Sequence, residues 1–103
     1  MPTWIEASES EDLAPDALRR FDHLDRTFVI YRSPEDAYFC TDGLCTHEEV
    51  HLENGLVMGY EIECPKHNAT FDYRSGEALR APACVNLNTY ETKIDNGKVW
   101  ILV

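Results

Sequence analysis

Short apolar runs separated by turn-forming residues recur along the whole chain. The clearest is the segment 27–32, TFVIYR, which is rich in β-branched and aromatic residues and lies between Asp25 and Ser33-Pro34. Runs of this composition, bounded by Asp, Ser, Pro or Gly, are typical of β-strands. The chain is therefore expected to be all-β, with further strands at 4–7, 17–24, 38–41, 56–58 and 60–63.

Turn signals join some of these strands into hairpins. Asp95-Asn96-Gly97 separates the runs 88–94 and 98–103, and Asn-Gly is a strong hairpin signal. Gly59 divides two shorter runs in the same way. The segment 9–20 combines acidic residues with Pro15 and fits either a loop or a short helix. No internal repeat or linker interrupts the sequence, so we expect a single domain over residues 1–103.

Two motifs that each combine one cysteine with one histidine lie on either side of the hairpin around Gly59. They are Cys45-Thr46-His47 and Cys64-Pro65-Lys66-His67. Two thiolates and two imidazoles are the ligands of a Rieske [2Fe–2S] centre, in which two histidines replace two cysteines on one iron. Neutral imidazoles leave that iron easier to reduce than the thiolate-bound one. The two motifs therefore predict an electron-transfer site.

The chain resembles small Rieske ferredoxins that serve multicomponent, aromatic-ring-hydroxylating oxygenases. The resemblance rests on residues 45–82, which contain C-T-H, C-P-x-H and an F-D-x-x-x-G turn at 71–76, and extends through the tail 88–103. It implies a Rieske fold, in which an antiparallel β-sandwich base carries an inserted cluster-binding subdomain at about residues 43–80.

The same resemblance implies the ligand set of one Rieske-type [2Fe–2S] cluster. Cys45 and Cys64 would bind one iron, and His47 and His67 would bind the other. The histidines would lie near the tip of the protein, where a partner approaches closely. Each loop would thus supply one sulfur and one nitrogen to the cluster.

Asn68 is one departure from the family pattern. Many relatives have Gly directly after the second ligand histidine, because that turn uses left-handed backbone angles. Asn tolerates these angles better than other non-glycine residues, so we expect the turn to be retained. The His67-Asn68 pair is similar to a subgroup linked to rhizopine-type and related catabolic oxygenases.

Other departures concern the surroundings of the cluster. Respiratory and photosynthetic relatives have a disulfide between positions that match Val50 and Lys66 here, so this chain cannot form it. They also have Ser and Tyr hydroxyls at the positions of Ala69 and Phe71. Hydrogen bonds to cluster sulfurs raise the reduction potential, so their loss predicts a low value, roughly −150 mV. Phe71 and Leu44 are candidates for apolar cover of the cluster or for ordinary core.

The resemblance also implies an electron carrier rather than an enzyme. The protein would accept one electron from an NAD(P)H-dependent ferredoxin reductase and pass it to a terminal oxygenase, binding each partner transiently as a monomer. An alternative is a small Rieske subunit fixed in an enzyme complex, such as a nitrite reductase-like assembly. Copurification with a large subunit would favour that alternative.

A structural zinc site is the alternative use of the same four ligands, because a Cys₂His₂ set can hold zinc tetrahedrally. Zinc fingers usually pair like ligands, whereas each loop here mixes one cysteine with one histidine. Nucleophilic cysteine catalysis is disfavoured, because the sequence offers no base or oxyanion hole beyond the motif histidines.

The remaining cysteines and histidines are assigned structural roles. Cys40 and Cys84 have apolar neighbours in the sequence and are expected to be buried thiols. His51 lies close after the first motif but does not fit the C-x-H spacing. His23, in an expected strand or turn, is taken as a surface or packing residue.

The charge balance adds an expectation about partners and location. The 103 residues include 9 basic and 19 acidic side chains, a formal net charge of −10, which disfavours nucleic acid and favours basic patches on protein partners. The N-terminal segment is acidic and lacks the apolar core of a signal peptide, and no run approaches the roughly 20 apolar residues of a membrane span. A cytoplasmic protein that does not bind membranes is therefore expected.

Overall fold

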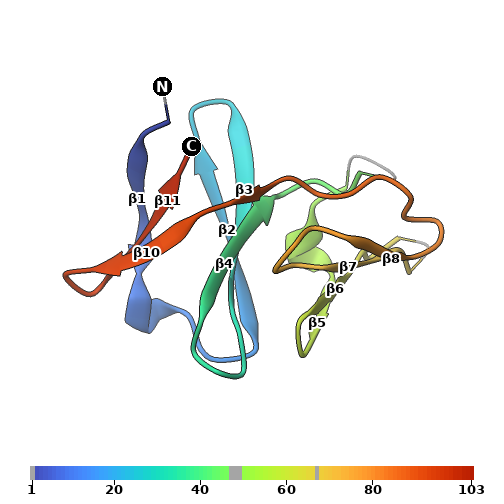
Figure 1. Ribbon diagram of the computed structural model, residues 1–103, viewed down its shortest axis with the longest axis horizontal. Coiled ribbons are helices and arrows are strands. Elements are labelled where there is room, and N and C mark those ends of the chain that lie inside the picture. The colour runs from blue at the N-terminus through green and yellow to red at the C-terminus, as the bar shows by residue number, and fades with distance from the viewer. Residues whose placement is uncertain (1, 47–49, 67) are drawn as a thin grey trace.

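The computed structural model describes residues 2–46, 50–66 and 68–103. It consists of short antiparallel strands and two single-turn 3₁₀ helices, η1 (Ser10–Asp12) and η2 (Leu52–Asn54) (Figure 1). The strands are β1 (Trp4–Glu9), β2 (Ala17–His23), β3 (Arg26–Arg32), β4 (Tyr38–Asp42), β5 (Leu56–Met58), β6 (Glu61–Glu63), β7 (Thr70–Asp72), β8 (Ala78–Arg80), β9 (Thr89–Tyr90), β10 (Thr92–Asp95) and β11 (Lys98–Leu102).

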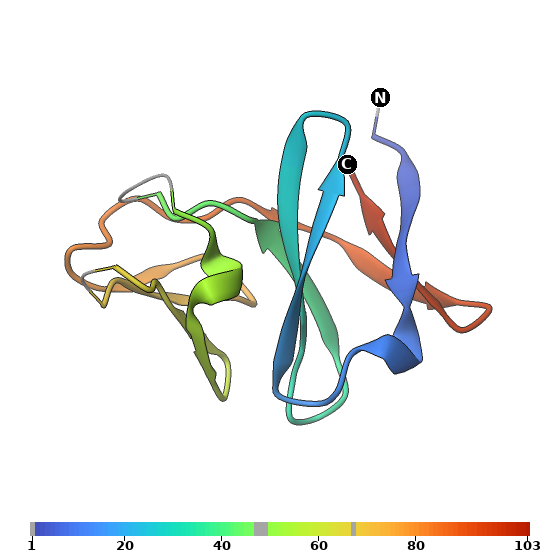
Figure 2. The same cartoon turned by 180° about the vertical axis from the view of Figure 1, so that it is seen from behind.

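The strands form three antiparallel sheets. Two of them, with strand orders β1-β11-β10 and β2-β3-β4-β9, pack as the sandwich that we call the base. The third, with order β5-β6-β7-β8, stands beside the base in both views (Figures 1 and 2). This arrangement confirms the predicted all-β fold.

Strand β3 is buried on both faces because it separates two hydrophobic cores. Successive side chains of a strand point to opposite faces. Phe28 and Ile30 therefore pack inside the base, whereas Val29 and Tyr31 pack against the third sheet. All four side chains are at most 1% exposed, which explains the uninterrupted apolar run of this segment.

The third sheet and the loops around it are inserted between β4 and β9. These two strands pair with each other, and the Asp42 N–H donates to the Asn88 carbonyl at 3.1 Å where the insert leaves and rejoins the base. The Gly43 N–H also bonds the Thr27 carbonyl, at 2.9 Å, which fixes the start of the insert to β3. The insert is therefore anchored at a narrow neck.

Two sequence expectations need correction or completion. The run 88–94 was expected to be one strand, but it is divided between β9, which pairs with β4, and β10, which pairs with β11. The open segment 9–20 contains the short helix η1, a turn with Asp16 at φ +64°, and the start of β2. The hairpins around Gly59 and Asn96-Gly97 form as predicted.

Candidate metal centre

The first motif lies in a loop that is closed by its own backbone. Cys45 comes shortly after β4, and its N–H donates to the Val50 carbonyl at 2.9 Å. Below this bond, Leu44 pairs with His51 in an isolated antiparallel bridge, and the Leu52 N–H donates to the Gly43 carbonyl at 2.9 Å. The two arms of the loop thus form a narrow ladder with Cys45 at its end.

The second motif lies at the tip of the β6–β7 hairpin. The Cys64 N–H donates to the Ala69 carbonyl at 2.6 Å, directly beyond the Glu63–Thr70 pair. Asn68 has a φ of +59°, so the predicted left-handed conformation is confirmed. Each cysteine amide therefore bonds the carbonyl five residues ahead, and the two loops are closed in the same way.

The two motif cysteines lie in one hydrophobic core although they are far apart in the sequence. Cys45 is 2% exposed and Cys64 is 1% exposed. Both belong to the core between β3 and the third sheet, together with Leu52, Ile62, Ala69, Phe71 and Tyr73. All four cysteines of the chain are described, and none is in a disulfide. The structure therefore places two thiols in common apolar surroundings.

The two motif histidines, His47 and His67, lie outside the described residues. In the sequence, each falls between the cysteine and the carbonyl that close its loop. His51 lies instead at the base of the first loop, where it pairs with Leu44 and precedes η2. Its Nδ1 is buried and has no hydrogen-bond partner among the described residues.

A third segment, residues 81–87, borders the first loop and was not anticipated from the motifs. The Thr46 hydroxyl donates to the Val85 carbonyl at 2.6 Å. The Ala83 N–H bonds the Arg80 carbonyl and the Leu87 N–H bonds the Gly76 carbonyl, which hold the segment to the third sheet. Its apolar residues around Pro82 were the available signal, but nothing in that pattern specifies contact with Thr46.

The two cysteines outside the motifs have different environments. Cys40 is 1% exposed in the core of the base, and burial raises the pKa of its thiol. Cys84 was expected to be buried as well, but it is exposed. Its apolar sequence neighbours misled the prediction because Ala83 and Leu87 turn into the core whereas Val85, at 57% exposure, does not.

The two apolar residues suggested as cover of the cluster also differ in their burial. Phe71 is fully buried and belongs to the same core as both cysteines. Leu44 is only partly buried and lines a groove together with Cys45. No hydroxyl stands at position 69 or 71, and the nearby Thr70 hydroxyl is bonded to the Asn68 carbonyl at 3.1 Å.

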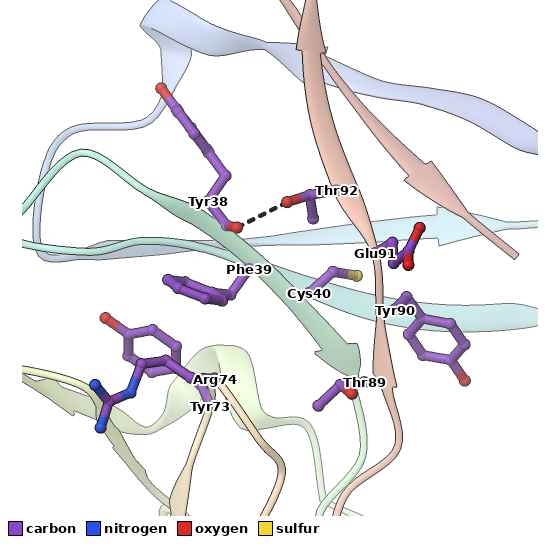
Figure 3. A pocket seen from close by; sticks show the side chains of 9 residues that line it. All are labelled: Tyr38, Phe39, Cys40, Tyr73, Arg74, Thr89, Tyr90, Glu91 and Thr92. Carbon is purple, nitrogen blue, oxygen red and sulfur yellow. Dashed lines mark hydrogen bonds between the residues drawn. The ribbon is translucent and has the colours of Figure 1, made fainter.

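A separate hollow of about 320 Å³ lies where β4 and β9 face the third sheet (Figure 3). Phe39 and Tyr73 point toward each other there, and the Thr92 hydroxyl donates to the Tyr38 carbonyl at 2.7 Å. The Arg74 guanidinium contacts the Asp72 carboxylate at 2.9 Å and is therefore already paired. Neither motif cysteine lines this hollow, which belongs to the junction between base and insert.

The fold and the paired thiol loops are those of a small metal-binding β-sandwich. Residues 3–91 match the family model described as the Rieske [2Fe–2S] domain. The chain belongs to this family, and its cofactor is one Rieske-type [2Fe–2S] cluster. Cys45 and Cys64 fit that cofactor, because buried thiols in apolar surroundings can supply its two sulfur ligands.

Similar proteins include ferredoxin components of dioxygenase systems. The chain is 37% identical to that of the naphthalene 1,2-dioxygenase system of Pseudomonas putida, over 95% of this chain and 93% of the relative. It is 32% identical, with the same coverages, to that of the 2,4-dinitrotoluene dioxygenase system of Burkholderia sp. (strain RASC).

Solved structures give the same result for the fold. The ferredoxin of carbazole 1,9a-dioxygenase from Nocardioides aromaticivorans IC177 superposes with a TM-score of 0.90 at 26% identity, covering 96% of each chain. A chain in the complex of reduced oxygenase and oxidized ferredoxin of carbazole 1,9a-dioxygenase gives 0.91 at 28% identity, covering 95% of this chain and 91% of that one. In the described part of our chain, no helix is long and apolar enough to cross a membrane.

Proposed function

We propose that this protein is a Rieske ferredoxin that accepts one electron from an NAD(P)H-dependent reductase and delivers it to a terminal oxygenase of the aromatic-ring-hydroxylating type. The observation that carries the proposal is that Cys45 and Cys64 belong to one hydrophobic core. Each lies in a loop that is closed by an equivalent backbone hydrogen bond, from the cysteine N–H to the carbonyl five residues ahead. When bound, the cluster takes up and releases one electron. The protein is an electron carrier and does not transform the substrate of the oxygenase.

The proposed ligands are Cys45 and Cys64 on one iron and His47 and His67 on the other. The cysteines are buried inside the insert and would supply the two sulfur ligands of the cluster. The histidines follow them in the sequence within the same closed loops. The backbone bonds of Cys45 and Cys64 hold these two proposed ligands in place, and rigid ligands keep reorganisation during electron transfer small.

The residues around the cysteines support a low reduction potential. Ala69 and Phe71 are fully buried and carry no hydroxyl that could donate to a cluster sulfur. The hydroxyls of Thr46 and Thr70 are engaged by backbone carbonyls. We therefore expect a midpoint near the low end of the Rieske range, about −150 mV, which suits transfer from NAD(P)H toward an oxygenase.

The net charge of −10 supports transient docking onto basic patches of a reductase and an oxygenase. The chain would act as a monomer in the cytoplasm, where thiols stay reduced. Raising the salt concentration should slow its reduction by the reductase, because screening weakens such steering.

The first test of this function is spectroscopic. The protein, purified without added metal, should be red-brown and should give a rhombic EPR signal after dithionite, with an average g below that of all-cysteine [2Fe–2S] proteins. His67→Cys should lower the potential toward about −400 mV, because a thiolate adds negative charge to the reducible iron. A colourless protein with one bound zinc would overturn the proposal, and an unchanged potential in the variant would overturn the assignment of His67.

The second test concerns the partners. The reduced protein, mixed with the terminal oxygenase of the naphthalene 1,2-dioxygenase system, should be oxidised as the oxygenase is reduced. It should also migrate as a separate monomer between turnovers. Obligate copurification with one large subunit would instead favour a fixed subunit of an enzyme complex.

A further inference from the structure

Leu24 occupies a backbone conformation that its side chain disfavours. It is the first residue of the two-residue turn between β2 and β3, where His23 pairs with Arg26, and its φ is +58°. Gly, Asn or Asp usually fill such positions, because a bulky side chain is strained there. Leu24 is also 89% exposed, so burial in the fold does not compensate the strain. Strain without a folding benefit points to a role in function.

The turn that carries Leu24 borders the cluster end of the molecule. Asp25, the next residue, lines a groove of about 480 Å³ together with Leu44, Cys45 and Val85. The Gly43 N–H bonds the Thr27 carbonyl at 2.9 Å, which fixes the turn relative to the first motif loop. A side chain that enters this groove therefore lies against a proposed cluster ligand.

Val85 gives the groove an exposed apolar side chain. It is 57% exposed, and its carbonyl accepts the Thr46 hydroxyl at 2.6 Å, so its position is fixed by a residue of the first motif. Leu24 lines a neighbouring hollow of about 290 Å³, which shares Asp25, Arg26 and Thr27 with the groove. Leu24 and Val85 are thus exposed apolar residues of two adjoining hollows. Apolar anchors at the centre of a contact supply most of the binding energy in protein interfaces.

The charges in the groove specify what can fill it. Asp42 is compensated by Arg26 at 3.9 Å and accepts hydrogen bonds from Tyr90 and Asn88. Asp25 has no ion-pair partner in the part of the chain that the structure describes. The surface around Asp25 thus carries exposed apolar side chains at Leu24 and Val85 and, among the described residues, one carboxylate without an ion-pair partner. It suits an apolar side chain that is accompanied by a basic residue.

We propose that Leu24 and Val85 are the apolar anchors by which this protein docks to its terminal oxygenase, with Asp25 facing a basic residue of that partner. The inference rests on the proposed function, because it assigns the groove beside Cys45 to the electron acceptor. Docking there brings the acceptor against the first cluster loop. Leu24 is a docking residue and takes no part in holding the cluster.

The test measures reduction of a terminal oxygenase at increasing concentrations of the reduced protein. Terminal oxygenases of the naphthalene, 2,4-dinitrotoluene and carbazole dioxygenase systems serve as acceptors, and one that the wild type reduces is used for the variants. Leu24→Asn keeps the turn but removes the apolar side chain, and Leu24→Met keeps an apolar side chain. Ile94→Asn is the matched control, because Ile94 is 48% exposed on β10, in a sheet of the base (Figure 1).

We expect Leu24→Asn to raise the half-saturating concentration about tenfold and Val85→Ser to raise it severalfold, as for the loss of one buried aliphatic contact. The half-saturating concentrations of Leu24→Met and Ile94→Asn should stay within about twofold of the wild-type value. A twofold change corresponds to less than half of the free energy of a tenfold change. The visible spectrum and midpoint potential of each variant report whether the cluster is intact.

Several outcomes would overturn the proposal. If the wild type reduces the oxygenase and Leu24→Asn has the same half-saturating concentration, the docking role is refuted. The proposed function is then unaffected. A change confined to the reaction with the reductase would assign the groove to the electron donor instead. A wild type that reduces none of the three oxygenases would refute the proposed function, and the docking role with it.

Discussion

The rings of Tyr31 and Tyr73 stack face to face, with centroids 4.4 Å apart and an interplanar angle of 3°. Tyr31 belongs to β3 of the base, whereas Tyr73 directly follows β7 of the insert. Both are fully buried, and the Tyr73 hydroxyl donates to the Gly59 carbonyl at 2.7 Å. This pair therefore joins the third sheet, which carries the second motif loop, to the β2-β3-β4-β9 sheet of the base.

Truncation of Tyr73 should therefore destabilise the whole protein. Tyr73→Ala removes the stack and opens a cavity, with an expected cost of roughly 3–5 kcal/mol in the free energy of unfolding. Tyr73→Phe keeps the stack and loses one hydrogen bond, with an expected cost of about 1 kcal/mol. Urea denaturation, followed by loss of visible absorbance and by circular dichroism, measures both values. Equal costs for the two variants would show that the stack contributes nothing.

Alkaline pH should destabilise the protein through two phenols whose pKa the fold raises. Burial raises the pKa of Tyr73 to about 12, and burial together with a hydrogen bond to Asp42 raises that of Tyr90 to about 12. Because both values lie above the ordinary value of about 10, the stabilisation is complete below about pH 10 and is lost as the pH rises toward 12. A titration of tyrosinate absorbance should show these phenols ionising late, together with unfolding. Two fewer late-ionising groups in Tyr73→Phe/Tyr90→Phe would verify the assignment, and no difference from the wild type would contradict it.

Substitutions of Asn68 should report on the conformation of the second loop. Its φ of +59° suits Asn and Gly, whereas a β-branched side chain is strained there. Asn68→Gly should be close to neutral, and Asn68→Val should cost about 1–2 kcal/mol and lower the iron content of the purified protein. Iron analysis and thermal denaturation provide the measurement. Full iron content and unchanged stability in Asn68→Val would argue against this conformation.

The two cysteines outside the motifs should differ in reactivity. Cys84 is exposed, whereas Cys40 is buried and the pKa of its thiol is raised, so that little thiolate forms near neutral pH. A maleimide added to the folded protein with its cluster intact should modify one site, Cys84, and mass spectrometry of the peptides should identify it. Cys84→Ser is the control and should be unmodified under the same conditions. Labelling of Cys40 at a similar rate would contradict the described burial.

Much of the fold was predictable because strand signals are local. The existence of β3, the Asx-Gly turn before β11 and the left-handed conformation of Asn68 follow from residue preferences within a few positions. The run 88–94 was wrongly expected to be one strand, because it is continuous in the sequence and only tertiary pairing divides it between two sheets.

The site was predictable to a similar degree. The motif spacing anticipated that Cys45 and Cys64 come together, and the structure places both in one hydrophobic core. The assignment of His47 and His67 as ligands stays a prediction. The contact between Thr46 and Val85 and the exposure of Cys84 depend on how a distant segment folds back, which no local pattern encodes.

The narrow neck of the insert has a consequence for how such a domain can change. The insert leaves the base at Asp42 and returns at Asn88, and these residues are joined by a backbone hydrogen bond of 3.1 Å and a side-chain bond of 2.9 Å. With respect to the base, the segment between these residues is a long loop whose two ends are held together by hydrogen bonds. Since closure entropy grows only slowly with loop length, evolution can lengthen, shorten or exchange this segment while the sandwich is conserved. A graft of residues 43–87 onto another paired β-hairpin would therefore also need the side chains of Val29 and Tyr31, because the insert packs its core against them.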